Sequence, residues 1–200
     1  PLAREWQVMA MKIAYLDCFS GISGDMTVGA FLDAGLKLSF LKKKLALLNV
    51  KGYTISARAQ TRGGISGTKF DVKINSGRRG EVTPWGRIKN LIQKSRLDEG
   101  TKALAISIFE SLAEAEARVH ARNKKDIHFH EIGDLDSIID IVSTAAAVVK
   151  FDIKEFYCLN LRAGAGSIDS CHGNLPLPAP AVVQMLKGKR VSFKDAGHEL

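Results

Sequence analysis

The sequence predicts an α/β fold with some α+β character, in which a mixed sheet carries flanking helices and one antiparallel hairpin. Three observations lead to this class. A β-rich apolar run at residues 12–18 passes through a glycine loop into a helical pattern. Two runs with a hydrophobic period near two, at 53–59 and 69–74, flank a glycine turn. Strands and helices alternate along the rest of the chain, which is typical of α/β domains.

The first half of the chain contains helical patterns with clear apolar stripes. After the glycine loop, apolar side chains recur at Val28, Phe31 and Leu32. The next predicted helix has leucines on one face and lysines on the opposite face. Thr83 before Pro84 is typical of a helix start, with Thr83 as the N-cap. The predicted elements are a strand at 12–18, helices at 27–34 and 39–48, strands at 53–59 and 69–74, and a helix at 84–93.

The second half opens with the longest helical pattern, whose apolar stripe recurs every three to four residues. Asp134 or Asp136 is predicted to cap another apolar helix. A β-rich run then enters a glycine-rich loop, followed by an extended segment with three prolines. The predicted elements are helices at 101–121, from Asp134 or Asp136 to Val149, and at 181–186, with strands at 156–162 and 191–193.

The composition is that of an ordinary globular protein. The chain has 200 residues, of which 46% are hydrophobic and 25% charged, enough to bury a core. No run approaches the roughly 18 consecutive apolar residues of a membrane span, and we predict no membrane partner and a cytoplasmic location. Residues 1–10 are interpreted as an upstream extension and residues 11–200 as an N-terminal α/β domain.

The net charge and the cysteine content limit the kinds of ligand and of stabilising site that the chain is expected to have. The formal net charge of +8 suits anionic ligands such as nucleotides or nucleic acid, although a solvated basic surface is the simpler interpretation. Three cysteines without short paired spacing argue against a disulfide framework and against a zinc ribbon.

A glycine-rich loop follows the first predicted strand. Such a loop can direct backbone N–H groups and the positive end of a helix toward an anion, and its carboxylates can bind a cation. It is neither a P-loop nor a dinucleotide fingerprint. A tight turn with Asp25 as helix N-cap is the alternative. The candidate phosphate- or nucleotide-binding residues are Asp17, Ser20, Gly21, Ser23 and Gly24, and Asp25 is a candidate catalytic residue.

The segment His128-Phe129-His130-Glu131 is the principal metal-site candidate. In extended backbone, side chains two residues apart point to the same face, so both imidazoles can bind one ion. Glu131 can add an oxygen ligand or orient an imidazole, and is the second candidate catalytic residue. Imidazole suits zinc, nickel, copper or iron, so the residue types do not select the metal. A pair of partly exposed loop histidines is the alternative.

Carboxylates on the following helix are further candidate metal ligands. Asp136 and Asp140 are four residues apart and share a helix face. Asp140 lies between two isoleucines, where a buried carboxylate needs a partner. A capping Asp136 and a solvated Asp140 are the alternatives. Glu116 and His120, also four apart, are interpreted as a surface or structural pair.

The glycine-proline segment 163–180 places Cys171 beside His172. A thiol next to an imidazole occurs in metal sites and in activated nucleophiles. His172 is therefore a further candidate metal ligand, although a loop with a buried cysteine is the simpler interpretation. Cys18 and Cys158 are interpreted as small, buried strand residues.

Three segments in this order resemble one known family: DCFSGISGDM at 17–26, HFHEIG with the following DSIIDIV at 128–142, and CHGNLPLPAPA at 171–181. On these residues the chain resembles the LarC family, the nickel insertion proteins of lactate racemase maturation, over residues 11–200. The resemblance implies a nickel chelatase of the lyase class. Its members insert nickel into a pyridinium bisthiocarboxylate mononucleotide, which becomes the nickel-pincer cofactor.

The resemblance also implies roles for residues. Nickel would bind His128, His130 and Glu131, with His172 as an additional ligand, and the 17–25 loop would hold a phosphate or its Mg²⁺ or Mn²⁺ ion. The reaction would depend on CTP, bound by a C-terminal domain. Because the family is about twice as long, we expect this chain to be the first half, truncated or separately encoded. Asp134 departs from the small residue of the family.

Two other functions stay open. The first is a phosphate-binding hydrolase that uses the glycine loop and the histidines on one divalent ion. The second is a noncatalytic domain whose basic clusters bind nucleic acid, which would show steep salt dependence. The residues do not decide the oligomeric state, and a homo-oligomer is one option.

Overall fold

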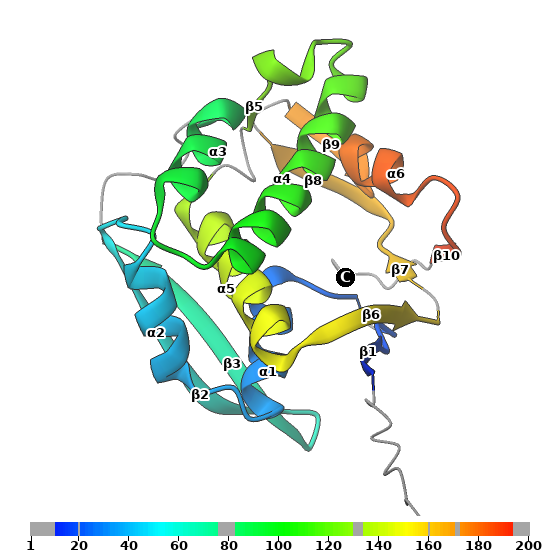
Figure 1. Ribbon diagram of the computed structural model, residues 1–200. Coiled ribbons are helices and arrows are strands. Elements are labelled where there is room, and N and C mark those ends of the chain that lie inside the picture. The colour runs from blue at the N-terminus through cyan, green and yellow to red at the C-terminus, as the bar shows by residue number, and fades with distance from the viewer. Residues whose placement is uncertain are drawn as a thin grey trace, which may run out of the picture.

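The computed structural model describes residues 11–19, 21–75, 83–129, 134–159, 161–170 and 173–193, in which helices pack around a long central helix (Figure 1). The helices are α1 (Gly24–Asp33), α2 (Leu38–Ala46), α3 (Trp85–Lys94), α4 (Glu99–Val119), the 3-10 turn η1 (Lys124–Asp126), α5 (Leu135–Phe151) and α6 (Pro180–Leu186). The strands are β1 (Lys12–Leu16), β2 (Tyr53–Arg62), β3 (Ile65–Ile74), β4 (Thr83–Pro84), β5 (His128–Phe129), β6 (Ile153–Cys158), β7 (Leu161–Ala163), β8 (Gly166–Ser170), β9 (Gly173–Leu177) and β10 (Val191–Phe193).

The strands form five pairs within the described residues. β1 runs parallel to β6, with Leu16 beside Cys158, and β7 runs parallel to β10. The pairs β2–β3, β4–β5 and β8–β9 are antiparallel. Parallel and antiparallel strands thus accompany the helices, and the predicted mixed α/β class is confirmed, although the pairs do not join into one sheet among these residues.

The predicted hairpin is β2–β3, which closes through a two-residue turn. Gly63 and Gly64 both adopt positive φ, of 55° and 81°, between the paired residues Arg62 and Ile65. A turn of this kind requires left-handed backbone at both positions and matches the twist of the strands, which explains the two glycines.

A second hairpin, β8–β9, forms where the sequence suggests a glycine-proline loop. Half-buried Leu175 and Leu177 alternate with exposed Asn174 and Pro176. The period of two that predicts a strand is therefore present, but glycine and proline, which usually interrupt strands, obscure it.

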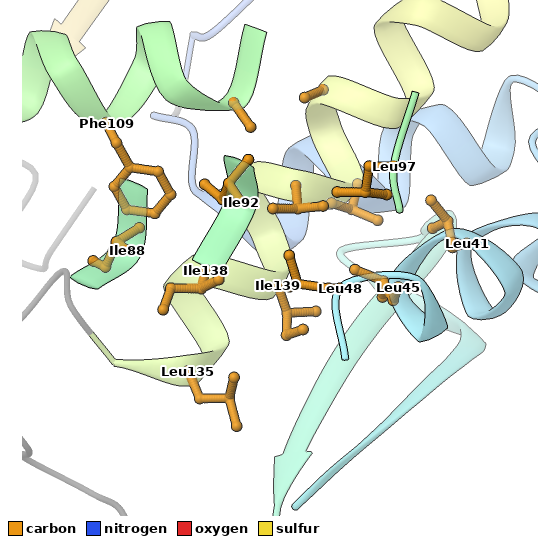
Figure 2. Close-up of a cluster of buried hydrophobic side chains, with 14 of the residues drawn as sticks. Leu41, Leu45, Leu48, Ile88, Ile92, Leu97, Phe109, Leu135, Ile138 and Ile139 are labelled. Carbon is orange, nitrogen blue, oxygen red and sulfur yellow. The ribbon is translucent and has the colours of Figure 1, made fainter. Parts of the chain in front are cut away.

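Helix α5 is the centre of the fold and packs against α1, α2 and α4. In Figure 1, α2 and the β2–β3 hairpin lie on one side of it and α6 on the other. Figure 2 shows the core that results, in which side chains from α2, α3, α4 and α5 converge. The fully buried members include Leu41, Leu45, Leu48, Ile88, Ile92, Phe109 and Ile139.

Helix starts differ from the sequence predictions in two places. Ser23, not Asp25, is the N-cap of α1, and its hydroxyl accepts a hydrogen bond from the Met26 backbone N–H. The predicted N-cap role of Thr83 is wrong, because Thr83 is drawn into extended pairing with Phe129 and Pro84 takes the cap position. Helix α5 begins after Asp134, one of the two predicted positions.

The strand predicted at 156–162 is divided between two elements. β6 ends at Cys158 and pairs with β1, whereas β7 begins at Leu161 and pairs with β10. A single β-rich run can thus serve two sheets, because strand pairing is decided by partners distant in sequence. None of the described helices is long and apolar enough to cross a membrane.

Candidate functional site

The glycine loop packs directly on helix α5 at Asp140. A Cβ atom placed on Gly24 would lie 2.5 Å from the Asp140 Oδ2 atom and 2.9 Å from its Cβ atom. Only glycine permits this approach, since any larger residue would overlap the carboxylate. The structure therefore brings together two segments, 17–25 and 135–151, which the sequence indicates as separate candidates for a binding site.

The carboxylates of Asp25 and Asp136 are near enough to Asp140 to repel its negative charge, and the environment of Asp140 is the most unusual. Burial raises the pKa of Asp140, and the carboxylates of Asp25 and Asp136 raise it further, to about 7. Its buried Oδ1 atom has no hydrogen-bond partner among the described residues. A site of this kind favours a proton or a cation, either of which would relieve the repulsion between the carboxylates.

The raised pKa of Asp140 predicts a pH-dependent cost to folding. From its ordinary value of 3.8 up to about 7, the unfolded chain releases this proton while the folded chain retains it, so stability falls as pH rises through that window. In metal-free protein we expect Asp140→Asn to raise the free energy of unfolding by ~1–2 kcal/mol at pH 8, after allowance for solvent screening, and by less at pH 5.

Urea unfolding at both pH values measures this effect. Asp126→Asn, which removes an exposed carboxylate away from the junction, is the control and should leave the pH dependence unchanged. Equal pH dependence in Asp140→Asn and the unchanged chain would show that Asp140 titrates normally.

His128 lies on the short strand β5, just before α5. Its ring Nδ1 is 3.0 Å from the backbone carbonyl oxygen of Asp126, and its side chain is exposed. A carbonyl accepting from Nδ1–H leaves Nε2 available as a metal ligand. The neighbouring Phe129 is buried against Trp85 and Phe109 and so anchors the strand. His130 and Glu131 lie outside the described residues, so their convergence with His128 stays a prediction.

Sequence reasoning missed a pair of thiols at the carboxyl ends of the parallel strands. Cys18 follows β1, Cys158 ends β6, and the Cys158 side chain influences the Cys18 thiol. Burial raises the pKa of the Cys18 thiol, and Cys158 and Asp17 raise it further. The interpretation of both cysteines as buried strand residues is wrong in part, since Cys18 lies beyond β1 and Cys158 is exposed. The pairing of β1 with β6 brings them together, a contact that local patterns do not reveal.

The other predicted residues are placed as follows. Gly21 has a positive φ of 86°, as its turn requires, and the Ser23 hydroxyl donates to the Asp25 carboxylate. The Glu116 carboxylate lies 3.4 Å from His120 Nε2, consistent with the predicted surface or structural pair. Ser20, Cys171 and His172 lie outside the described residues. Within the described ranges, no group of three or more His, Cys, Asp or Glu side chains is arranged to hold a metal ion.

Comparison with known proteins decides the family. Residues 14–200 match the family described as nickel insertion protein. The chain belongs to that family. A relative in Syntrophobacter fumaroxidans, a putative nickel insertion protein, is 44% identical over 190 residues, covering 95% of this chain and 48% of the relative. The resemblance seen in the sequence is thus confirmed.

Two further relatives have more specific names. Proteins of Geobacillus kaustophilus and Acetivibrio thermocellus, 41% and 37% identical, are each called a pyridinium-3,5-bisthiocarboxylic acid mononucleotide nickel insertion protein. Each match covers 95% of this chain but 48% and 49% of the relative. This nickel insertion family chain therefore spans about half the length of these relatives. No solved structure matches it.

Proposed function

We propose that this chain contributes the nickel-handling half of a protein that inserts nickel into pyridinium bisthiocarboxylate mononucleotide. The observation that carries the proposal is the identity of 41% and 37%, over 95% of the chain, with two relatives named for that reaction. The product would be the nickel-pincer cofactor of lactate racemase, and the enzyme a nickel chelatase of the lyase class.

Nickel is the cargo of this reaction, and its proposed first ligands are His128, His130 and Glu131. Two features support this place. The backbone carbonyl beside His128 Nδ1 suits a metal-binding tautomer. In addition, α5 begins six residues after the end of β5 and carries Asp136 and Asp140, whose negative charge attracts a cation. His172 is proposed as an additional ligand.

Imidazole and carboxylate ligands fit a site that must release its ion. A closed cage of thiolates would retain nickel, whereas nitrogen and oxygen ligands can exchange for the two sulfur atoms of the acceptor. Glu131 and Asp25 are the proposed catalytic residues, and Asp25 contributes to the negative charge beside Asp140.

Two further roles are proposed, one for a C-terminal domain and one for the 17–25 loop of this chain. CTP, with Mg²⁺ or Mn²⁺, would bind a C-terminal domain encoded with this half or separately. The 17–25 loop is proposed to hold a phosphate or its divalent ion. The carboxylates of Asp25, Asp136 and Asp140 around the start of α1 favour the ion over a bare phosphate.

Nickel binding to a tag-free chain tests the metal assignment. We expect about one nickel ion per chain, and the double variant His128→Ala/His130→Ala should bind at least tenfold more weakly because two ligands are lost. Isothermal titration, with metal analysis after dialysis, measures both quantities. His120→Ala is the matched control, since that histidine pairs with Glu116 on α4 and is not a proposed ligand.

Two results would count against the proposal. Unchanged nickel affinity in the double variant would remove His128 and His130 as ligands. Release of phosphate from a nucleotide by the chain alone, without nickel or a pyridinium ligand, would instead favour a metal-dependent hydrolase.

A further inference from the structure

A cavity of about 970 Å³ lies between the end of α2, one face of α3 and the first turn of α5. Its size is within the range of small-molecule sites and is sufficient for a mononucleotide. It differs from the site described above, because Asp136 and Asp140 are not among its lining residues. The cavity has no role in the proposed function so far.

The polar lining of this cavity is strongly basic. Lys51, Arg87, Lys94 and Arg96 contribute to its wall, and Asp134 is the one acidic residue among the described lining residues. Lys51, Lys94 and Arg96 form no ion pair within the described part of the chain. Unpaired cations around a concavity focus positive potential and attract anions.

Two hydrogen bonds fix the backbone of the segment that carries Lys94 and Arg96. The Ser95 hydroxyl donates to the Ile92 carbonyl oxygen at 2.6 Å and ends α3, while the Arg96 N–H donates to the Leu47 carbonyl oxygen at 3.0 Å. The second bond ties the residue after α3 to the segment that follows α2, so the backbone at Lys94 and Arg96 is held at the wall of the cavity. Both side chains are exposed, so an anion in the cavity can reach them from solvent.

The rest of the wall combines apolar residues with the uncharged polar residues Asn49, Thr83, Asn90 and Ser95. Leu48, Ile88, Leu135 and Ile138 are buried residues that also line the cavity. A ring can pack on such a surface while a charged group reaches the cations, which is the usual arrangement of a small-molecule site. The lining thus suits a ligand that combines an aromatic ring with a phosphate.

The cavity lies next to β5, the strand that carries the proposed nickel ligand His128. Thr83 lines it and pairs with Phe129, the residue between the two histidines. Asp134 and Leu135, also lining residues, are the N-cap and the first residue of α5. A ligand in this cavity would therefore have the strand that carries His128 at its edge.

We propose that this basic cavity binds the phosphate-bearing pyridinium mononucleotide, with its phosphate at Lys51, Lys94 and Arg96. That the ligand carries a pyridinium ring rests on the proposed function. That it carries a phosphate rests on the basic residues that line the cavity. It assigns the nucleotide phosphate to a different place from the acidic junction at Gly24, where carboxylates repel it.

Binding of two matched probes tests the proposal. Nicotinic acid mononucleotide carries a pyridinium ring and a phosphate, and nicotinic acid riboside lacks only the phosphate. We expect the mononucleotide to bind the 200-residue chain at least tenfold more tightly than the riboside. In the triple variant Lys51→Gln/Lys94→Gln/Arg96→Gln that difference should disappear, because the phosphate loses its cations.

A control triple variant, Lys42→Gln/Lys43→Gln/Lys125→Gln, removes the same charge from exposed residues outside the cavity and should retain the difference. The inference is overturned if the mononucleotide and riboside bind the unchanged chain equally, if neither binds, or if the cavity variant still discriminates between them. Urea unfolding confirms that both triple variants fold.

Nickel titration of the same proteins separates this inference from the proposed function. If the chain binds no nickel but prefers the mononucleotide to the riboside, and the cavity variant loses that preference, the cavity assignment is supported and nickel handling is contradicted. Nickel binding that depends on His128 and His130, with no cavity-dependent discrimination, would overturn the cavity assignment alone.

Discussion

Phe109→Ala is expected to lower the free energy of unfolding by about 3–5 kcal/mol, because it removes a fully buried ring from the centre of the core. The Phe109 ring centroid lies 6.3 Å from that of Trp85 and 6.1 Å from that of Phe129. Other buried residues of α4 lie above and below Phe109 along the helix. The cavity left by the ring therefore cannot close without loss of contacts elsewhere. Urea unfolding at constant pH measures the loss.

The same change should also weaken nickel binding, because Phe129 anchors the strand that carries His128. Phe156→Ala, which removes an aromatic ring that is 50% exposed on β6, is the control and should cost much less stability. If Phe109→Ala destabilised the chain no more than Phe156→Ala, the aromatic cluster would not be the support of β5.

Gly29→Ala is the second change with a large expected effect. A Cβ atom on Gly29 would lie 2.4 Å from the backbone carbonyl oxygen of Thr68, where α1 crosses β3. No side-chain rotation relieves contact with a backbone atom, so α1 must move away from the hairpin. We expect a loss of about 2–3 kcal/mol, as for other overpacked sites.

The Asp33–Thr68 contact makes this movement more costly. One turn after Gly29, the Asp33 carboxylate accepts hydrogen bonds from the Thr68 N–H at 2.9 Å and the Thr68 hydroxyl at 2.5 Å. These bonds lower the pKa of Asp33. A displaced α1 would break them and would also move Gly24 away from Asp140.

Gly86→Ala is the matched control for Gly29→Ala. Gly86 lies in the first turn of α3, and a Cβ atom there would meet no heavy atom within 4 Å. The change should leave stability unaltered or raise it by up to ~1 kcal/mol through a smaller unfolded-state entropy. Thermal unfolding of both variants provides the comparison. Equal midpoints would mean that α1 and β3 are not in close contact.

Elements with strong periodicity could be predicted from the sequence. The stripe of leucines in α2, the long pattern of α4 and the double glycine of the β2–β3 turn each reflect local geometry, which neighbouring residues impose. Helix starts were less certain. Thr83 has the chemistry of an N-cap, but pairing with Phe129, 46 positions away, draws it into an extended conformation instead.

The candidate site was predictable only as separate segments. The sequence indicates that Asp140 is an unusual carboxylate in an apolar helix, and this holds in the structure. That its partner is Gly24 follows only from the packing of α1 on α5. The Cys18–Cys158 pair likewise depends on β1 lying beside β6, and no local spacing indicates it.

The order of residues by itself determined the family, the mixed fold class and the residue types that can bind a metal, because motifs and periodicity are local properties. The tertiary structure alone decided which of those residues meet. It placed three carboxylates around the start of α1, raising the pKa of Asp140, and gathered basic side chains from α3 and the segments that follow α2 and α3 around one cavity. Charge repulsion and cavity shape depend on distances between elements remote in sequence, so they arise only when the chain folds.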